Sequence, residues 1–182
     1  VLQMYLAGQA SGGAAVNLLF GDATPCGKLA ETFPLHLEDN PSYLNFPGNR
    51  EKVCYQEGVF IGYRYYDKKK MDVLFPFGYG LSYTDFEIGG IDSDKDTLSL
   101  SRLKNGESFK ISVKVKNAGD TDGKETVQLY IKDEVSSVVR PLRELKGYKK
   151  IFVKAGETVN VEFVIGFEEL SFYNAKLEKT VE

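Results

Sequence analysis

The sequence predicts an α+β protein that is mainly β, with a β-sandwich in the part that follows Tyr83. The main observation is that apolar and polar residues alternate in three runs, at Phe109–Val115, Val127–Ile131 and Val159–Ile165. A period of two is typical of strands with one buried and one solvated face. Turn sequences such as Asn117–Asp120 separate the runs. Short strands repeated at this spacing indicate two packed sheets.

The centres of the three runs are expected to form the core of the sandwich. We therefore predict that Val113, Val127 and Phe163 are buried, because each lies in the middle of an alternating run.

The first part of the chain supplies the α component of the prediction. Small and apolar residues recur at helical spacing after Ala10, and Gly21 follows the last of them, so a helix is expected between these two positions. The apolar run Val1–Leu6 predicts the end of a buried parallel strand. Leu29–Phe33 alternates like a short strand.

Aromatic residues concentrate between these two parts, most densely in Leu74–Tyr83. Pro76 favours an extended chain before it, while Gly78 and Gly80 permit backbone conformations or contacts that a side chain would block. Gly58–Asp67 has near-helical aromatic spacing, so one or two helical turns are expected there. Because disordered linkers are poor in aromatics, the whole region from residue 35 to residue 83 is predicted to pack along one flank of the sandwich.

Composition excludes several classes of function. The net charge of −3 gives no electrostatic footprint for nucleic acid or an anionic membrane. No apolar run approaches the ~20 residues of a membrane span. Cys26 and Cys54 are the only cysteines and are interpreted as free thiols, which favours the cytoplasm over secretion. The compartment stays open, because the chain begins without Met or a basic leader and targeting information is absent.

Several blocks of sequence resemble the C-terminal part of glycoside hydrolase family 3, which is dominated by β-glucosidases. Gly62–Asp67 and Leu74–Tyr83 carry the resemblance most specifically. Gly21–Pro34 is similar to the segment that closes the family's α/β sandwich domain. Lys116–Asp120 and Arg140–Gly147 resemble the fibronectin type III-like domain that ends many members.

The resemblance implies three parts. Residues 1–37 are expected to be the C-terminal remnant of an α/β sandwich domain, and residues 38–82 an aromatic-rich linker packed on neighbouring domains. Residues 83–182 are expected to form a fibronectin type III-like, or immunoglobulin-like, β-sandwich. In the family a further hairpin usually follows the segment matching Leu170–Tyr173, so the last strand is expected to be missing and an edge to be open.

The resemblance assigns no catalytic residue to this chain. Retaining glycosidases need two carboxyl groups ~5–5.5 Å apart, and the family takes its nucleophilic aspartate from a (β/α)₈ barrel of ~250 residues. The chain has 182 residues and no Trp for the family's Ser-Asp-Trp-type nucleophile motif. His36 is the only histidine, and one histidine with acidic residues scattered along the chain does not provide a set of metal ligands. No metal and no cofactor is expected.

Tyr63, Arg64 and Tyr65 are the candidate substrate-binding residues. Aromatic and guanidinium groups bind sugar rings or orient carboxylates. The competing interpretation is that Arg64 lies in an aromatic interface between domains.

The resulting hypothesis is the C-terminal part of a family 3 enzyme, with a buttressing role and no activity alone. Its expected partners are the missing catalytic barrel, the rest of the α/β sandwich domain and, in the parent enzyme, a β-linked glucoside. Two alternatives stay open. One is a carbohydrate-binding module that uses exposed aromatics such as Tyr130 or Tyr148, and the other is a dimerisation module that forms a homodimer.

Overall fold

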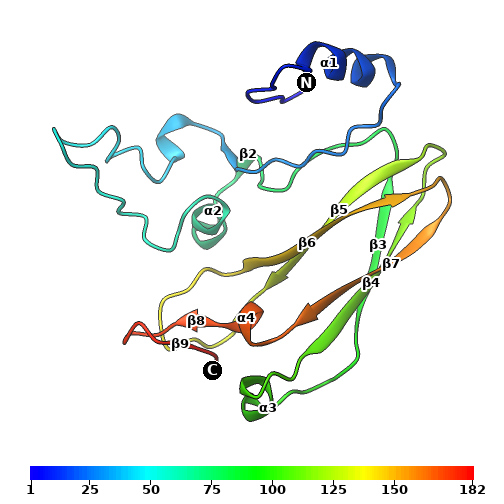
Figure 1. Cartoon of the computed structure of the whole chain (residues 1–182). Helices are drawn as coiled ribbons and strands as arrows, with labels where there is room; N and C mark the ends of the chain where they lie inside the picture. The colour runs from blue at the N-terminus through cyan, green and yellow to red at the C-terminus, as the bar shows by residue number, and fades with distance from the viewer.

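The computed structural model describes all 182 residues and shows a β-sandwich with a long N-terminal extension (Figure 1). One sheet has the order β3–β4–β7, formed by Phe86–Ser93, Phe109–Asn117 and Thr158–Ile165. The second sheet pairs β5, Gly123–Ile131, with β6, Glu144–Val153. All these pairings are antiparallel. The predicted α+β, mainly β class with a β-sandwich is confirmed.

Short elements connect or cover the two sheets. They are the helices α3 (Leu100–Lys104) and α4 (Phe167–Leu170) and the C-terminal hairpin of β8 (Phe172–Tyr173) with β9 (Lys179–Thr180).

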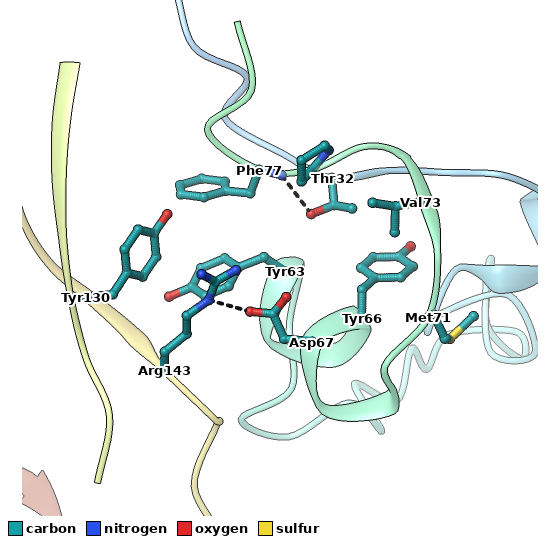
Figure 2. Close-up of a pocket in the computed structure, with 10 residues that line it drawn as sticks. Thr32, Tyr63, Tyr66, Asp67, Met71, Val73, Phe77, Tyr130 and Arg143 are labelled. Atoms are coloured by element: carbon teal, nitrogen blue, oxygen red, sulfur yellow. Dashed lines mark hydrogen bonds and ion pairs between the residues drawn. The ribbon is translucent and has the colours of Figure 1, made fainter. Parts of the chain in front are cut away.

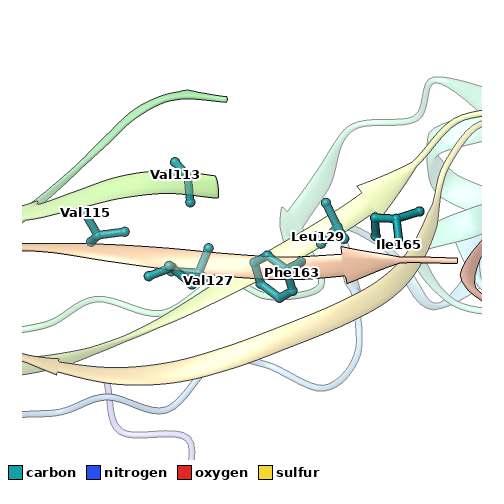
Figure 3. Packing of buried hydrophobic residues seen from close by; sticks show 7 residues of the cluster. Val113, Val115, Val127, Leu129, Phe163 and Ile165 are labelled. Carbon is teal, nitrogen blue, oxygen red and sulfur yellow. The ribbon is translucent and has the colours of Figure 1, made fainter. Parts of the chain in front are cut away.

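The core lies between the two sheets and consists of inward-facing residues of the three strands β4, β5 and β7 (Figure 3). The predicted core positions are confirmed, because Val113, Val127 and Phe163 are all buried. The alternation of the sequence therefore gave the correct faces of β4, β5 and β7. The full cluster comprises Val113, Val115, Val127, Leu129, Val161, Phe163 and Ile165.

The N-terminal helix forms where the sequence predicts it. Helix α1 covers Ser11–Phe20, and Gly21 ends it in the left-handed conformation with φ of 82°. None of its residues is buried. The prediction of a strand at Val1–Leu6 is wrong: this stretch has no regular structure, and Val1 and Leu6 are fully exposed. A parallel strand needs neighbouring strands to satisfy its backbone, and the chain offers none here.

Strand β1 (Phe33–Pro34) precedes the linker, which begins in the 3₁₀ turn η1 (Leu37–Asp39) and contains α2 (Tyr63–Lys69) and β2 (Val73–Phe75). Strand β1 pairs with β2 and is shorter than the predicted strand at residues 29–33, although Leu29 exchanges backbone hydrogen bonds with the 78–79 stretch. The helical turns expected before residue 67 are present in α2.

The linker packs on the sandwich only in its second half. From α2 onward it lies against β5 and β6, whereas the stretch between η1 and α2 extends away from the sandwich (Figure 1). Phe46 and Tyr55 in that stretch are 76% and 85% exposed. The prediction that the entire linker packs along the sandwich is therefore wrong for this stretch.

The chain as a whole exposes far more surface than a compact protein of its mass. Its accessible surface is 12727 Å², whereas a compact monomer of 20.3 kDa would expose about 8,800 Å². Only 18 of 182 residues are buried, so a large part of the apolar surface has no cover within this chain. None of its helices combines the length and the apolar character that a membrane-spanning segment needs.

Candidate functional site

The best-formed site is the joint where the linker meets the outer face of the second sheet (Figure 2). We call this cluster the aromatic joint and define it as Tyr63, Tyr66 and Asp67 of α2, Phe77 of the linker, and Tyr130 and Arg143 of the sandwich. Tyr63 lies at its centre. Its ring stacks on Phe77 with centroids 5.0 Å apart and meets Tyr130 edge-on at 5.8 Å.

The hydroxyl of Tyr63 ties the linker to the sheet. It accepts a hydrogen bond of 2.8 Å from the backbone N–H of Leu145. Residue 145 lies opposite Tyr130 in the β5–β6 ladder, at the register shift of that ladder. A backbone donor next to such an irregularity has lost its regular ladder partner, and Tyr63 replaces it.

An ion pair closes the open side of the joint. The Nε of Arg143 donates to Oδ2 of Asp67 at 2.7 Å, and the guanidinium also lies over the Tyr130 ring, 5.0 Å from its centroid. The hydrogen bond to Asp67 raises the pKa of Arg143. Burial raises the pKa of both Tyr66 and Tyr130. All three pKa shifts favour the protonated form, which suits packing and not proton transfer.

The cavity inside the joint is small. It has a volume of about 40 Å³, enough for one or two water molecules and far below the ~300 Å³ at which small-molecule sites begin. It opens beside Met71 and Arg143 onto a shallow groove of about 590 Å³ that Lys70, Lys132 and Leu142 also line.

The glycines of the aromatic stretch allow the linker to approach the sheet closely. Gly78 has φ of 80°, and a Cβ on it would lie 2.5 Å from Oε1 of Gln128 on β5. Gly80 packs against the backbone carbonyl of Gly27, so a side chain there would collide with the preceding segment. Both glycines are required by packing and not by ligand contact.

Further contacts attach the N-terminal segment to the same region. Lys28 forms an ion pair of 3.0 Å with Glu125, and both side chains are less than one-fifth exposed. The Tyr83 hydroxyl donates to the carbonyl of Leu18 at the end of α1, at 2.6 Å. Segments far apart in sequence are thus held by polar side chains as well as by rings.

The three predicted substrate-binding residues lie on α2 but have different surroundings. Tyr63 is the centre of the joint. Arg64 is half-buried, with its guanidinium 6.0 Å from the Tyr63 centroid, and Tyr65 packs edge-on against Tyr66 at 5.4 Å. The partners that sequence reasoning missed are Tyr130 and Arg143, which lie more than 60 residues from α2. No local pattern indicates that pairing.

The structure contains no group of three or more side chains positioned to hold a metal ion. His36 precedes η1, where its backbone N–H donates to the carboxylate of Asp39. Of the linker carboxylates, Asp67 is in the ion pair of the joint.

The fold and the joint together define a β-sandwich module to which a long N-terminal extension is fastened. Residues 1–63 match the glycosyl hydrolase family 3 C-terminal domain, and residues 125–182 match the fibronectin type III-like domain. The chain belongs to glycosyl hydrolase family 3 and carries the C-terminal part of that architecture.

Individual relatives agree with this assignment. The chain is 53% identical over 178 residues to thermostable β-glucosidase B of Acetivibrio thermocellus, covering 98% of this chain and 23% of that protein. It is 41% identical to β-glucosidase BoGH3A of Bacteroides ovatus, covering 97% of this chain and 23% of the relative.

Solved structures show the same fold. The crystal structure of the Bifidobacterium adolescentis GH3 β-glucosidase superposes with a TM-score of 0.84 at 41% identity, over 94% of this chain and 24% of the other. β-Glucosidase 3B of Thermotoga neapolitana gives a TM-score of 0.82 at 35% identity, over 93% and 23%. The chain therefore spans less than a quarter of the length of these relatives.

Proposed function

We propose that this chain is the structural C-terminal part of a β-glucosidase-like enzyme that cleaves β-linked glucosides on other domains. In this role the sandwich buttresses the catalytic domains and supplies no catalytic carboxylate. The observation that carries the proposal is the aromatic joint, in which Tyr63 binds the Leu145 amide, Arg143 binds Asp67, and the enclosed cavity measures about 40 Å³. Such a site fastens segments together and does not hold a sugar.

The exposed apolar surface supports the same proposal. Helix α1, the turn η1 and the stretch between η1 and α2 present large apolar side chains to solvent, and exposed apolar surface can mark an interaction site. We propose that the catalytic barrel and the remainder of an α/β sandwich domain cover them, with domain divisions near residues 37 and 82. The side chains concerned are Val16, Leu19, Phe20, Leu37, Leu44, Phe46, Val53, Tyr55 and Ile61.

A role toward substrate is proposed only for residues of α2 that the joint leaves available. The ring and hydroxyl of Tyr63 are occupied by Phe77, Tyr130 and the Leu145 amide. Arg64 and Tyr65 have no hydrogen-bond partner for their side chains in this chain, so they keep polar groups available to a substrate or to a neighbouring domain.

The alternative functions have less support. As a carbohydrate-binding platform, the outer face of the second sheet offers two exposed aromatic rings, Tyr148 and Phe152 of β6. Tyr130 is covered by Tyr63 and Arg143. Planar sugar platforms need several aligned rings. Homodimer formation stays a prediction, which light scattering of the purified chain decides.

The proposal is tested by assaying the purified chain with an aryl β-glucoside. We expect no turnover above the blank, because the chain holds no barrel to supply a nucleophile. Asp67→Asn and Glu125→Gln variants serve as controls for contaminating activity. Turnover that disappears when a carboxylate of this chain is replaced would show that the chain is catalytic and that the proposal is wrong.

A further inference from the structure

Arg140 lies at the centre of a compact group of charges in the 132–143 loop, which joins β5 to β6 beside the C-terminal hairpin (Figure 1). Its guanidinium forms an ion pair of 2.8 Å with Asp133 near the start of the loop. A second, longer contact of 3.6 Å reaches Glu144 at the start of β6. Its Cζ also lies 4.6 Å from the centroid of the Phe172 ring in β8. One side chain therefore holds both ends of the loop and the hairpin together.

The group contains more cations than carboxylates and is largely shielded from solvent. Lys146 binds Glu144 at 2.9 Å, and the charge of Arg64 on α2 also acts on Glu144. Arg140, Lys146 and Glu144 each expose less than one-fifth of the side chain, and Asp133 exposes 22%. We call these five residues the Arg140 cluster. Its three cations are balanced by only two carboxylates.

Acid removes the carboxylates of the cluster and leaves its cations. Burial raises the pKa of Glu144, but the neighbouring cations outweigh burial and lower it. The stabilising contribution of Glu144 is therefore present at neutral pH and disappears as the pH falls through its native pKa, which lies below about 4.5. Protonation of Asp133 removes the second anion. A buried ion that has lost its partner is strongly destabilising, so Arg140 and Lys146 then repel each other with no compensating charge.

The core of the sandwich has no group that responds to acid in this way. Its seven members are all apolar, and none belongs to the 132–143 loop. The loop contains no helix or strand. Its other polar contacts also end on carboxylates and are more exposed than the Arg140 cluster. They are the ion pairs of Lys132 with Glu134 and of Arg143 with Asp67, and the hydrogen bond from the Ser137 N–H to Glu182.

We propose that the Arg140 cluster is an acid-sensitive clasp, which holds the 132–143 loop in place at neutral pH and releases it in acid while the two sheets stay folded. Release withdraws the Arg140 guanidinium from the ring of Phe172 and so frees the loop from the C-terminal hairpin. The position of one surface loop then depends on pH, which the structural role proposed above does not require.

At neutral pH the clasp is tested by removing its anions. The double variant Asp133→Asn, Glu144→Gln carries uncharged groups of the same shape, and thermolysin reports release by cutting beside the apolar residues of the loop. We expect cleavage within the loop to be about tenfold or more faster than in wild type at about pH 7. Glu134→Gln, which removes an exposed charge of the same loop, is the matched control and should be cut like wild type. Cleavage of the stretch between η1 and α2 provides the internal reference, and equal loop cleavage of the double variant and wild type would overturn the proposal.

In acid the clasp is tested by removing its cations. The double variant Arg140→Met, Lys146→Met places apolar side chains at both positions, so these two buried charges no longer remain when the carboxylates are protonated. We expect pepsin at about pH 3 to cut the loop of wild type about tenfold faster than the loop of this variant. Circular dichroism should show the strands of both proteins intact under these conditions. Equal cleavage of the two loops, or loss of the strands together with the loop in wild type, would contradict the proposed clasp.

Discussion

The hydroxyl of Tyr63 connects two segments that are 82 residues apart, and it does so at a backbone donor that the sheet leaves unpaired. The ring of the same residue contributes stacking with Phe77 and an edge contact with Tyr130. Removal of the hydroxyl oxygen alone therefore separates the polar from the apolar contribution of Tyr63 to stability.

Tyr63→Phe should remove the acceptor for the Leu145 N–H and keep the ring contacts. We expect a loss of about 1–2 kcal/mol in the free energy of unfolding, because a part-buried donor is left without a partner. Urea unfolding measures it. Tyr65→Phe is the matched control, since the Tyr65 hydroxyl has no hydrogen-bond partner and its loss should be within about 0.5 kcal/mol. Equal effects of the two substitutions would contradict the role assigned to Tyr63.

Glu144 provides a prediction on pH dependence. Burial raises the pKa of its carboxyl, but the hydrogen bond and charge of Lys146 and the charges of Arg140 and Arg64 outweigh burial and lower it. A carboxyl with a lowered native pKa stabilises the fold above its unfolded pKa, and this contribution disappears as the pH falls through the native pKa. The loss is therefore expected below about pH 4.5.

We expect wild type to be more stable than Glu144→Gln at about pH 6 and the two proteins to converge toward about pH 3. Thermal unfolding across this range measures the difference. Glu134→Gln, at a 77% exposed side chain, controls for the loss of one surface charge. A difference between wild type and Glu144→Gln that is constant with pH would contradict the assigned ion contacts.

At the scale of elements, the linker holds its position because its glycines let it lie flat on β5. Gly78→Ala should cost about 1–3 kcal/mol, because alanine at φ of 80° is strained and its Cβ would lie 2.5 Å from the Gln128 side chain. Gly90→Ala is the control, since nothing lies within 4 Å of a Cβ there and its φ is not positive. Unchanged unfolding of Gly78→Ala would mean that the linker does not lie against the sheet in solution.

The elements that were predicted correctly from the sequence are those in which apolar residues recur with the period of a strand or of a helix, because this period shows which face is buried. Strands β4, β5 and β7 and helix α1 follow from alternation or helical spacing together with a terminal turn or glycine. Val1–Leu6 was predicted wrongly. An apolar run indicates that a segment tends to be buried, but it does not show that the neighbouring strands needed to bury it are present. The joint was predicted in part: its aromatic stretch is visible locally, but the pairing of Asp67 with Arg143 spans 76 residues and leaves no periodic signal.

At the scale of the whole molecule, the surface is the main clue to function. The accessible area exceeds that of a compact monomer by about 3,900 Å², and α1 and the stretch before α2 carry several exposed large apolar side chains. An obligate interface between domains buries areas of this order. This exposed area supports the proposal that other domains cover the chain, which is itself fastened at the aromatic joint.

The most direct test of this structural role is the rate of aryl β-glucoside hydrolysis by a chimera. In it, this chain replaces the matching C-terminal region of β-glucosidase B of Acetivibrio thermocellus, to which it is 53% identical. We predict that removing that region abolishes hydrolysis and that inserting this chain restores kcat/KM to within about tenfold of the unmodified enzyme. A relative that keeps full activity without the region, or a folded chimera with none, would contradict the role proposed for this chain.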